Sequence, residues 1–169
     1  PFSIELLLLH EEEEAKYDPT VVDPKQLLGK GVSIEVVQSD GTSRFFNGIA
    51  NSFTQGTRHA RFTFYRMTLV PHVWILTQVR QSRIFQQKTV KEILKEVFKG
   101  FQVKDETQGE FARRNYCVQY RESDFDFASR LMEEEGIYYF FEHAKGSHKM
   151  ILANTPQSHP ECITKSTIP

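Results

Sequence analysis

The chain has 169 residues, of which 39% are hydrophobic and 25% are charged, so it is long enough to bury a core and has an ordinary globular composition. Its 21 basic and 22 acidic residues give a net charge of -1 and are spread along the chain, which argues against a nucleic-acid partner. The two cysteines, Cys117 and Cys162, are too few for the disulfide framework of a small secreted domain.

The first part of the chain predicts antiparallel β-structure. Residues 2–9 and 32–36 each place alternate apolar side chains on one face, the pattern of a strand with one buried side. Between the second of these strands and a returning strand at residues 44–53, Asp40 and Gly41 supply the left-handed conformations that a tight turn needs. We therefore expect a β-hairpin whose turn contains Asp40 and Gly41.

The next strand, at residues 61–70, changes its apolar face along its length. It begins with aromatic residues on one face and continues with Met67 and Leu69 on the other. A phase slip near Tyr65 and Arg66 is typical of a β-bulge, and bulges are common where sheets curl into barrels. We therefore expect a curled, barrel-like sheet in this part of the chain.

A helix is predicted near residues 89–99. Apolar side chains in this range follow the helical i, i+3, i+4 spacing, and lysine and glutamate residues lie on the opposite side. Thr89 and Glu92 have the spacing of a capping box, and Gly100 stands where a left-handed residue ends a helix.

A second helix is predicted near residues 123–135. Ser123 is placed to cap the amide of Asp126, and Gly136 marks the end of the helix. The three consecutive glutamates at 133–135 crowd the last turn, which is the unfavourable end of the helix dipole for negative charge. We therefore expect a basic side chain to face them.

These elements predict a β-rich α+β fold made of curled, barrel-like antiparallel sheets with two inserted helices. We expect a barrel-like subdomain over residues 1–80, partial at its N-terminus, and an α+β subdomain over residues 81–155. The second subdomain ends in a β-hairpin with strands near residues 137–141 and 149–153. An extended tail is expected at residues 156–169, and the chain is expected to be a piece of a longer polypeptide.

Candidate catalytic and metal sites are weak in this sequence. The pairs His143 with His148 and His159 with Cys162 do not form the rigid set of three or four ligands that zinc needs, so no metal and no cofactor are expected. Cys117 lies in a strand-like alternation where a small buried hydrophobic residue is expected rather than a nucleophile.

Acidic residues offer little more. The run at residues 11–14 predicts a solvated loop. A carboxylate pair for glycoside hydrolysis is a possible interpretation of the acidic residues Asp124, Asp126 and the glutamates at 133–135. Asp126 already has a capping explanation, however, and three consecutive glutamates splay around a helix. We therefore predict that the chain is not an enzyme.

Three long motifs resemble the VgrG family of type VI secretion tip proteins. They are SRIFQQKTV at residues 82–90, followed by EIL at 92–94, then YCVQYRESDFDF at 116–127 and RLMEEEGIYYFF at 130–141. Weaker likeness extends back to FNGI at residues 46–49, where the family more often has His at the position of Asn47. The resemblance covers the chain from Phe2 to about Pro160.

The resemblance implies the fold of the phage T4 baseplate hub, in which two barrel-like β domains with inserted helices form a ring of three copies. It implies a structural hub that trimerises, docks on the inner-tube hexamer protein, contacts baseplate components and carries the spike with its tip and effector proteins. It also implies assembly in the bacterial cytoplasm and secretion without a signal peptide. No apolar run of membrane-spanning length and no cleavable signal occur, so no stable membrane anchor is expected.

Within the motifs we expect the architectural or interface residues to be Arg83, Phe85, Gln86, Arg121, Glu122, Ser123, Asp124, Arg130 and Glu134. For Arg83 and Arg121 two interpretations stay open: an ion pair between subunits or domains, and a salt bridge or cap inside one subunit. Two other functions also stay open, a hub of a phage tail or other contractile injection particle, and a cell-wall hydrolase associated with such a tail.

Overall fold

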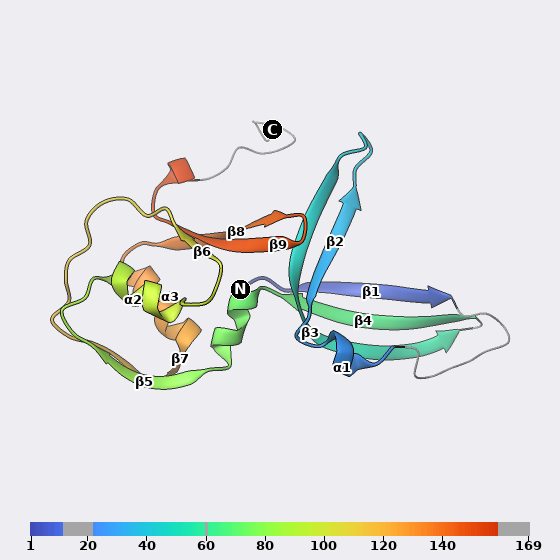
Figure 1. The fold of residues 1–169 in the computed structure, drawn as a ribbon, viewed down its shortest axis with the longest axis horizontal. Helices are drawn as coiled ribbons and strands as arrows, with labels where there is room; N and C mark the ends of the chain where they lie inside the picture. The colour runs from blue at the N-terminus through green and yellow to red at the C-terminus, as the bar shows by residue number, and fades with distance from the viewer. Residues whose placement is uncertain (12–21, 60, 159–169) are drawn as a thin grey trace. The chain divides into compact units, whose positions relative to one another are not determined.

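The computed structural model describes residues 1–11, 22–59 and 61–158 (Figure 1). These residues divide into two compact units, which are described separately. The first consists of Pro1–Ile75 together with His143–His148, and the second of Leu76–Glu142 together with the described residues from Lys149 onward. The predicted loop at residues 11–14 and the predicted extended tail at residues 156–169 lie almost entirely outside the described residues.

The first unit is built on one antiparallel sheet of four strands in the order β1-β4-β3-β2. Its elements are β1 (Ile4–Glu11), the short helix α1 (Pro24–Leu27), β2 (Gly31–Val37), β3 (Ser43–His59) and β4 (Phe62–Val70). The long strand β3 pairs with β2 along its first part and with β4 along the rest, and Ile49 takes part in both ladders.

This sheet is open. Among the described residues, β1 and β2 are its two edges and do not pair with each other. The expectation of a curled barrel is therefore wrong for the described part of the chain, while the expectation of β-rich antiparallel structure is confirmed. The physical reason is that β3 is long enough to hold β2 and β4 on successive segments, so that no strand has to close the sheet.

The hairpin predicted at Asp40 and Gly41 is confirmed. Gly41 adopts a φ of 81°, a conformation that side-chain-bearing residues rarely take. The amide of Thr42 donates to the Asp40 carboxylate at 2.9 Å, and the amide of Gln38 donates to the carbonyl of Thr42 at 2.8 Å. The turn residues therefore fix the register in which β2 pairs with β3.

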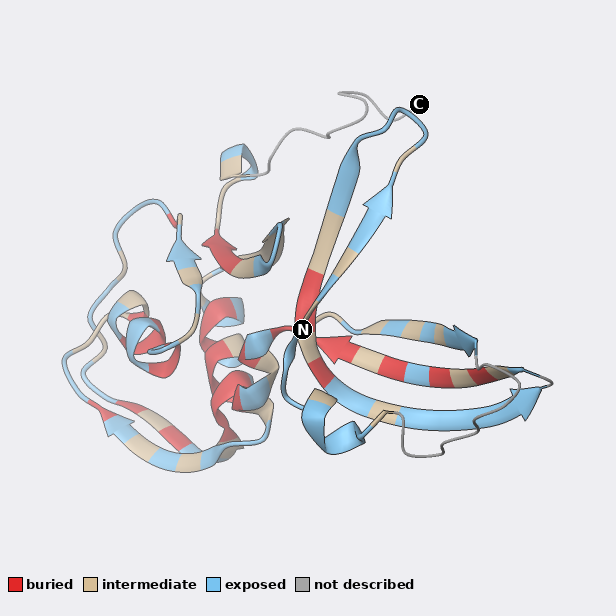
Figure 2. Ribbon diagram, turned by 45° about the vertical axis from the view of Figure 1, so that its right-hand side comes forward, coloured by how far each residue is buried: buried red, intermediate tan, exposed pale blue. Residues whose placement is uncertain are grey.

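The irregularity predicted near Tyr65 and Arg66 lies instead in the partner strand. In β4, buried and less buried residues alternate along most of the strand (Figure 2). Tyr65 and Met67 are among its buried residues. The register shifts fall in β3, between Ala50 and Ser52 and again after Gln55. The apolar residues at the start of β4 sit on its less buried face, which is why the sequence suggested a slip in this strand.

The core of this unit gathers on one face of the sheet. Leu69, Met67 and Ala50 are almost fully buried, and the inward side chains of β1 pack against them, as the period-2 pattern predicted. Those side chains are Ile4, Leu6 and Leu8.

The tip of a hairpin from late in the chain, His143–His148, also belongs to the first unit. The side-chain amide of Asn47, which is 3% exposed, donates to the carbonyls of Ala144 (2.7 Å) and Ser147 (2.8 Å). Its backbone amide donates to Nδ1 of His143 at 3.1 Å. Asn47 therefore donates hydrogen bonds to backbone carbonyls on both sides of this turn.

The second histidine of the tip is held in the same way. Nε2 of His148 accepts from the backbone amide of His72 at 3.0 Å. Both imidazoles act as acceptors, so each must be neutral at the nitrogen that accepts. Burial lowers the pKa of His143, with a further contribution from Arg44, and it lowers the pKa of His148, with contributions from His143 and His72.

The second unit contains two small sheets and two α-helices. Its elements are β5 (Arg80–Phe85), α2 (Val90–Val97), β6 (Val103–Asp105), β7 (Cys117–Ser123), α3 (Asp124–Glu134), β8 (Tyr138–Ala144), β9 (Ser147–Ala153) and the 3-10 helix η2 (Pro156–Ser158). A further 3-10 helix, η1 (His72–Thr77), lies where the chain passes from one unit to the other. Strand β5 pairs with β7, and the other sheet has the order β6-β9-β8, with β6 parallel to β9.

The two predicted helices form with the predicted caps. Thr89 accepts from the amide of Glu92, whose carboxylate accepts from the amide of Thr89, so the capping box is complete. Ser123 accepts from the amide of Asp126 at 3.0 Å at the start of α3. Each cap satisfies amides that the first turn of a helix leaves without a partner. No helix in the described ranges is both long and apolar enough to cross a membrane.

We predict that acid weakens the attachment of the hairpin tip. Because the pKa values of His143 and His148 are lowered in the folded state, the unfolded state binds protons more readily, and the stability present above about pH 6.5 is lost as the pH falls below it. Chemical denaturation between pH 8 and about pH 5 measures this loss. The double variant His143→Asn with His148→Gln keeps an acceptor at each position but cannot be protonated, and it should show a flatter pH profile. An equally steep profile in that variant would contradict the assignment.

Candidate functional site

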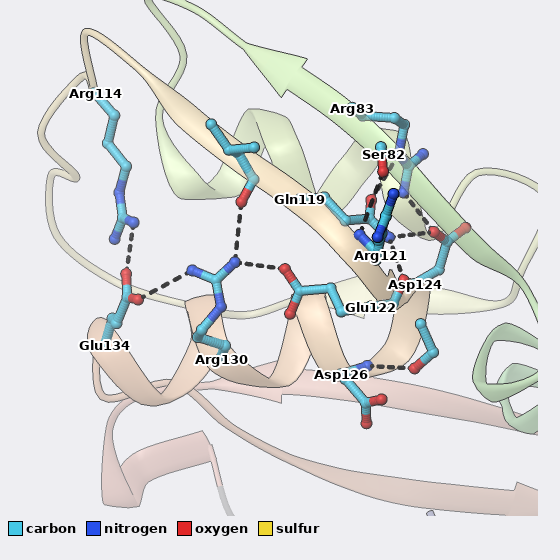
Figure 3. A network of polar contacts seen from close by, with 12 residues as sticks. Ser82, Arg83, Arg114, Gln119, Arg121, Glu122, Asp124, Asp126, Arg130 and Glu134 are labelled. Carbon is cyan, nitrogen blue, oxygen red and sulfur yellow. Dashed lines mark hydrogen bonds and ion pairs between the residues drawn. The ribbon is translucent and has the colours of Figure 1, made fainter.

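The motif residues meet where β5, β7 and the start of α3 come together (Figure 3). In the β5–β7 ladder, Arg83 lies opposite Gln119 and Phe85 lies opposite Cys117. Because side chains alternate along a strand, these four residues point to the buried side and their neighbours point outward. Cys117 is buried and is not paired in a disulfide, as predicted for a small hydrophobic residue, while Cys162 lies outside the described residues.

A buried carboxylate organises the inner side of this region. Asp124 is the first residue of α3, and its side chain is 5% exposed. The Arg83 guanidinium lies 2.8 Å from its Oδ1, and the side-chain amides of Gln119 (2.8 Å) and Gln81 (2.9 Å) also donate to it. A buried charge is tolerated only when such partners replace water, so this carboxylate fixes β5, β7 and α3 together.

Gln119 is the residue of this cluster that sequence reasoning missed. It is fully buried, donates to Asp124 and accepts from Nε of Arg83 at 2.8 Å. Its place in the inward alternation of the strand, two residues from Cys117, was the available signal. For Arg83, the interpretation as a salt bridge inside one subunit agrees with the structure, since its guanidinium forms an ion pair with Asp124 of the same chain.

The aromatic side of the cluster is formed by Phe85. Its ring stacks on Phe127 of α3 with centroids 5.5 Å apart and planes 14° from parallel, and both rings are buried. The cationic groups of Arg83 and Lys88 each lie 5.6 Å from the Phe85 ring. Phe85 is therefore a core residue that joins β5 to α3.

A chain of ion pairs runs along α3 (Figure 3). Arg130 contacts Glu122 at 2.7 Å and Glu134 at 3.4 Å, and Arg114 contacts Glu134 at 2.6 Å and Glu135 at 2.7 Å. The prediction that a basic side chain faces the glutamates at the end of this helix is confirmed. Arg114 lies between β6 and β7, outside the named helices and strands, so no periodic pattern in the sequence predicted that it would contact these glutamates.

These ion pairs shift the pKa values in a consistent direction. Hydrogen bonding to Arg114 lowers the pKa of Glu134, and hydrogen bonding to Glu122 raises the pKa of Arg130. For Arg114, burial alone lowers the pKa, but the bonds to Glu135 and Glu134 outweigh it and the net shift is upward. A general acid needs a raised carboxyl pKa, so the shift at Glu134 is the opposite of what glycoside hydrolysis requires.

Two of the predicted residues lie on the outer side instead. Gln86 is exposed and forms no hydrogen bond with a described residue. The Arg121 side chain is exposed, with its guanidinium 5.2 Å from the centre of the Tyr120 ring, and it forms no ion pair within the described part of the chain. The Arg121 backbone has a φ of 53°, unusual for a residue with a side chain, and its amide lies 3.3 Å from the hydroxyl of Ser82.

Large apolar or aromatic side chains are also exposed in the same segments of the chain. Ile84, Tyr116 and Tyr120 are 60%, 57% and 66% exposed, and Ile84 and Tyr120 point away from the buried side of the β5–β7 sheet. We call Ile84, Gln86, Tyr116, Tyr120 and Arg121 the outer face. Tyrosine and arginine are enriched among the residues that dominate protein interfaces. The motif therefore has an inner side that stabilises one chain and an outer face suited to a partner.

The described residues contain no group of three or more His, Cys, Asp or Glu side chains placed to hold a metal ion. The pair His143 and His148 instead accepts backbone hydrogen bonds, as described above.

Loss of the buried carboxylate is predicted to destabilise the second unit strongly. Asp124→Ala should lower the free energy of unfolding by about 3 kcal/mol, because it leaves the Arg83 charge and two amides without their acceptor. Asp126→Ala, two residues along the same helix and exposed, should cost about 0.5 kcal/mol through the helix dipole. Urea denaturation followed by circular dichroism measures both. Equal losses would show that the Asp124 cluster has no special role.

The ion pairs of Glu134 predict a pH-dependent contribution. Since the folded pKa of Glu134 is lowered, its stabilisation is present above the unfolded value of about 4.3 and is lost as the pH falls through the folded pKa. Glu134→Gln should therefore cost at most about 1 kcal/mol at pH 7, given its partial exposure, and nothing near pH 3. Glu133→Gln is the matched control, since Glu133 is exposed and has no ion pair with a described residue. A cost that persists in acid would contradict the ion-pair explanation.

Comparison with known proteins shows where this arrangement belongs. The profile of the phage tail baseplate hub (GPD) family matches residues 1–169. The type VI secretion system spike protein VgrG1b of Pseudomonas aeruginosa is 38% identical over 172 residues, covering 100% of this chain and 22% of that protein. VgrG1a of the same organism is 44% identical over 138 residues, covering 80% of this chain and 22% of its own length. The chain therefore spans less than a quarter of these relatives.

Solved structures show the same fold. The E. coli c3393 protein, described as a component of the type VI secretion system with structural similarity to the T4 tail proteins gp27 and gp5, matches with a TM-score of 0.81 at 19% identity. The match covers 94% of this chain and 43% of that one. The family is structural rather than catalytic, so the prediction that the chain is not an enzyme is confirmed. The chain belongs to the phage tail baseplate hub family, and its curated relatives are VgrG spike proteins of type VI secretion systems.

Proposed function

We propose that this chain is the hub portion of a trimeric type VI secretion tip, which docks on the inner tube and carries the spike that punctures target cells and delivers effectors. The observation that carries the proposal is the match to VgrG spike proteins along the whole chain, including the three motifs. The activity is mechanical: the chain transmits force and holds a ring together, and it performs no chemistry.

The division of the motif into two sides supports this role. The inner side ties β5, β7 and α3 together through buried charge and stacked rings, which stiffens the unit against load. The outer face leaves the Arg121 guanidinium exposed beside the Tyr120 ring, and Tyr116 is also exposed. We assign the contact with a second copy in the ring to this outer face.

The partners in this proposal are two further copies of the chain, the inner-tube hexamer protein, baseplate components, and spike-tip and effector proteins. Solved structures described as PdpA–VgrG complexes of Francisella share the fold, with a TM-score of 0.61 for one of them at 14% identity. We propose assembly in the bacterial cytoplasm followed by secretion without a signal peptide.

A second candidate is a hub of a phage tail or of another contractile particle. It is favoured by the likeness to the 43 kDa tail protein of prophage MuSo2 from Shewanella oneidensis, with a TM-score of 0.64 at 13% identity. Finding sheath and tube genes of one system or the other beside the gene for this chain would distinguish the two candidates. The cell-wall hydrolase is not retained, because the family is structural.

The oligomeric state of the full-length protein tests the proposal. Size-exclusion chromatography with light scattering should give a trimer, and a stable monomer at micromolar concentration would remove the central claim. Arg121→Glu should raise the dissociation constant of the trimer by about tenfold or more, since it reverses a charge on the outer face. Lys25→Glu, an exposed residue of α1, changes the net charge by the same amount and should leave the trimer intact. A trimer that tolerates Arg121→Glu would reject the outer face as the contact while leaving the hub assignment in place.

A further inference from the structure

The second unit contains a pocket that is lined by no residue of the Asp124 cluster and none of the outer face. Its volume is about 570 Å³, within the range of ligand-binding clefts, and it lies beside the C-terminal half of α2. Its apolar walls come from four separate parts of the unit: α2 and the turn after it, β6, the residue before β8, and β9. These wall residues are Leu94, Phe98, Phe101, Val103, Ile137 and Leu152.

Lysines line the α2 side of the pocket mouth. Lys91 and Lys95 lie one helical turn apart, and Lys99 follows in the turn after the helix. Four residues of helix advance about 6 Å, so Lys91 and Lys95 follow one another along one edge of α2, and Lys99 lines the same pocket from the turn beyond the helix. The pocket thus combines an apolar interior with a row of positive charge.

The negative residues at the mouth already have partners. Asp105 lies 3.2 Å from Nζ of Lys91, and Glu92 is held by the capping box and by Arg113 at 3.2 Å. Lys95 and Lys99 are exposed and form no ion pair with any residue in the described ranges. The mouth therefore carries two cations whose charge no described residue of the unit neutralises.

We propose that this pocket is a docking site for an acidic peptide segment that carries an apolar or aromatic anchor. The anchor fills the space between α2 and β9, and carboxylates of the segment pair with Lys95 and Lys99. In an extended chain, alternate side chains on one side are about 6.6 Å apart, so successive carboxylates on that side can each face a different lysine. A ligand with a single carboxylate, such as a fatty acid, would neutralise only one of the two. The inference does not depend on the trimer or on the secretion system.

Fluorescence polarisation with a labelled Asp-Phe-Asp-Leu-Asp peptide tests the proposal on the 169-residue chain. The peptide should bind, and the double variant Lys95→Glu with Lys99→Glu should weaken it by at least about tenfold. The matched control is Lys25→Glu with Lys30→Glu, which changes the net charge equally at exposed positions in the first unit and should bind like the wild type. Thermal melting shows that both variants remain folded, since all four lysines are on the surface.

Three further measurements make the outcome decisive. The peptide Asp-Ser-Asp-Ser-Asp should bind at least about tenfold more weakly, because it lacks the anchor. Chemical-shift changes in the labelled protein should centre on α2 and on Val103 and Leu152. Val103→Phe, which places a larger side chain at a half-buried wall position, should compete with the anchor and weaken binding.

Four results would overturn the proposal. They are the absence of binding at millimolar peptide, equal weakening by the two lysine pairs, equal binding of the serine peptide, and shift changes located elsewhere. Binding of dodecanoate at this pocket without binding of the acidic peptide would also overturn it, in favour of a lipid site.

Discussion

The buried carboxylate of Asp124 is the constraint on which the second unit depends. A charge that is 5% exposed needs partners in place of water, and each partner comes from a different position: Arg83 and Gln81 from β5, and Gln119 from β7. Because Asp124 is also the first residue of α3, the cap of Ser123 and the ion pair with Arg83 fix the same point. One carboxylate thus sets the register of a strand pair and the start of a helix together.

Strand alternation then gives the rest of the motif its two sides. Arg83 and Phe85 face inward, where they contact Asp124 and Phe127 of α3. Ile84 and Tyr120 face outward, and the left-handed backbone of Arg121 brings its side chain beside the Tyr120 ring. The motif therefore contains inward residues that join β5, β7 and α3 and outward residues to which we assign the proposed contact with a second copy.

In the first unit, the hairpin tip is held by hydrogen bonds from an uncharged side chain and its backbone rather than by a buried charge. Asn47 donates three hydrogen bonds to the hairpin tip, two of them through an amide that has no ionisable group. The resemblance to VgrG proteins singled out this position, because the family more often has His there. In this chain the two histidines lie on the opposite side of the contact, at positions 143 and 148, where both act as acceptors.

The sequence by itself determined the local structure. The capping box at Thr89, the cap at Ser123, the turn at Asp40 and Gly41, and the burial of alternate residues in β1 all depend on neighbours within a few positions, so periodicity and turn chemistry were sufficient to predict them. The long motifs were sufficient to predict the family. Only the tertiary structure decided three outcomes for the described residues: the first sheet is open, the irregularity lies in β3 instead of β4, and Arg83 has an ion-pair partner while Arg121 has none. Those outcomes depend on which distant segments of the chain pair with each other. The local patterns along a single sequence do not show which segment pairs with a given strand edge or which residue contacts a given charge.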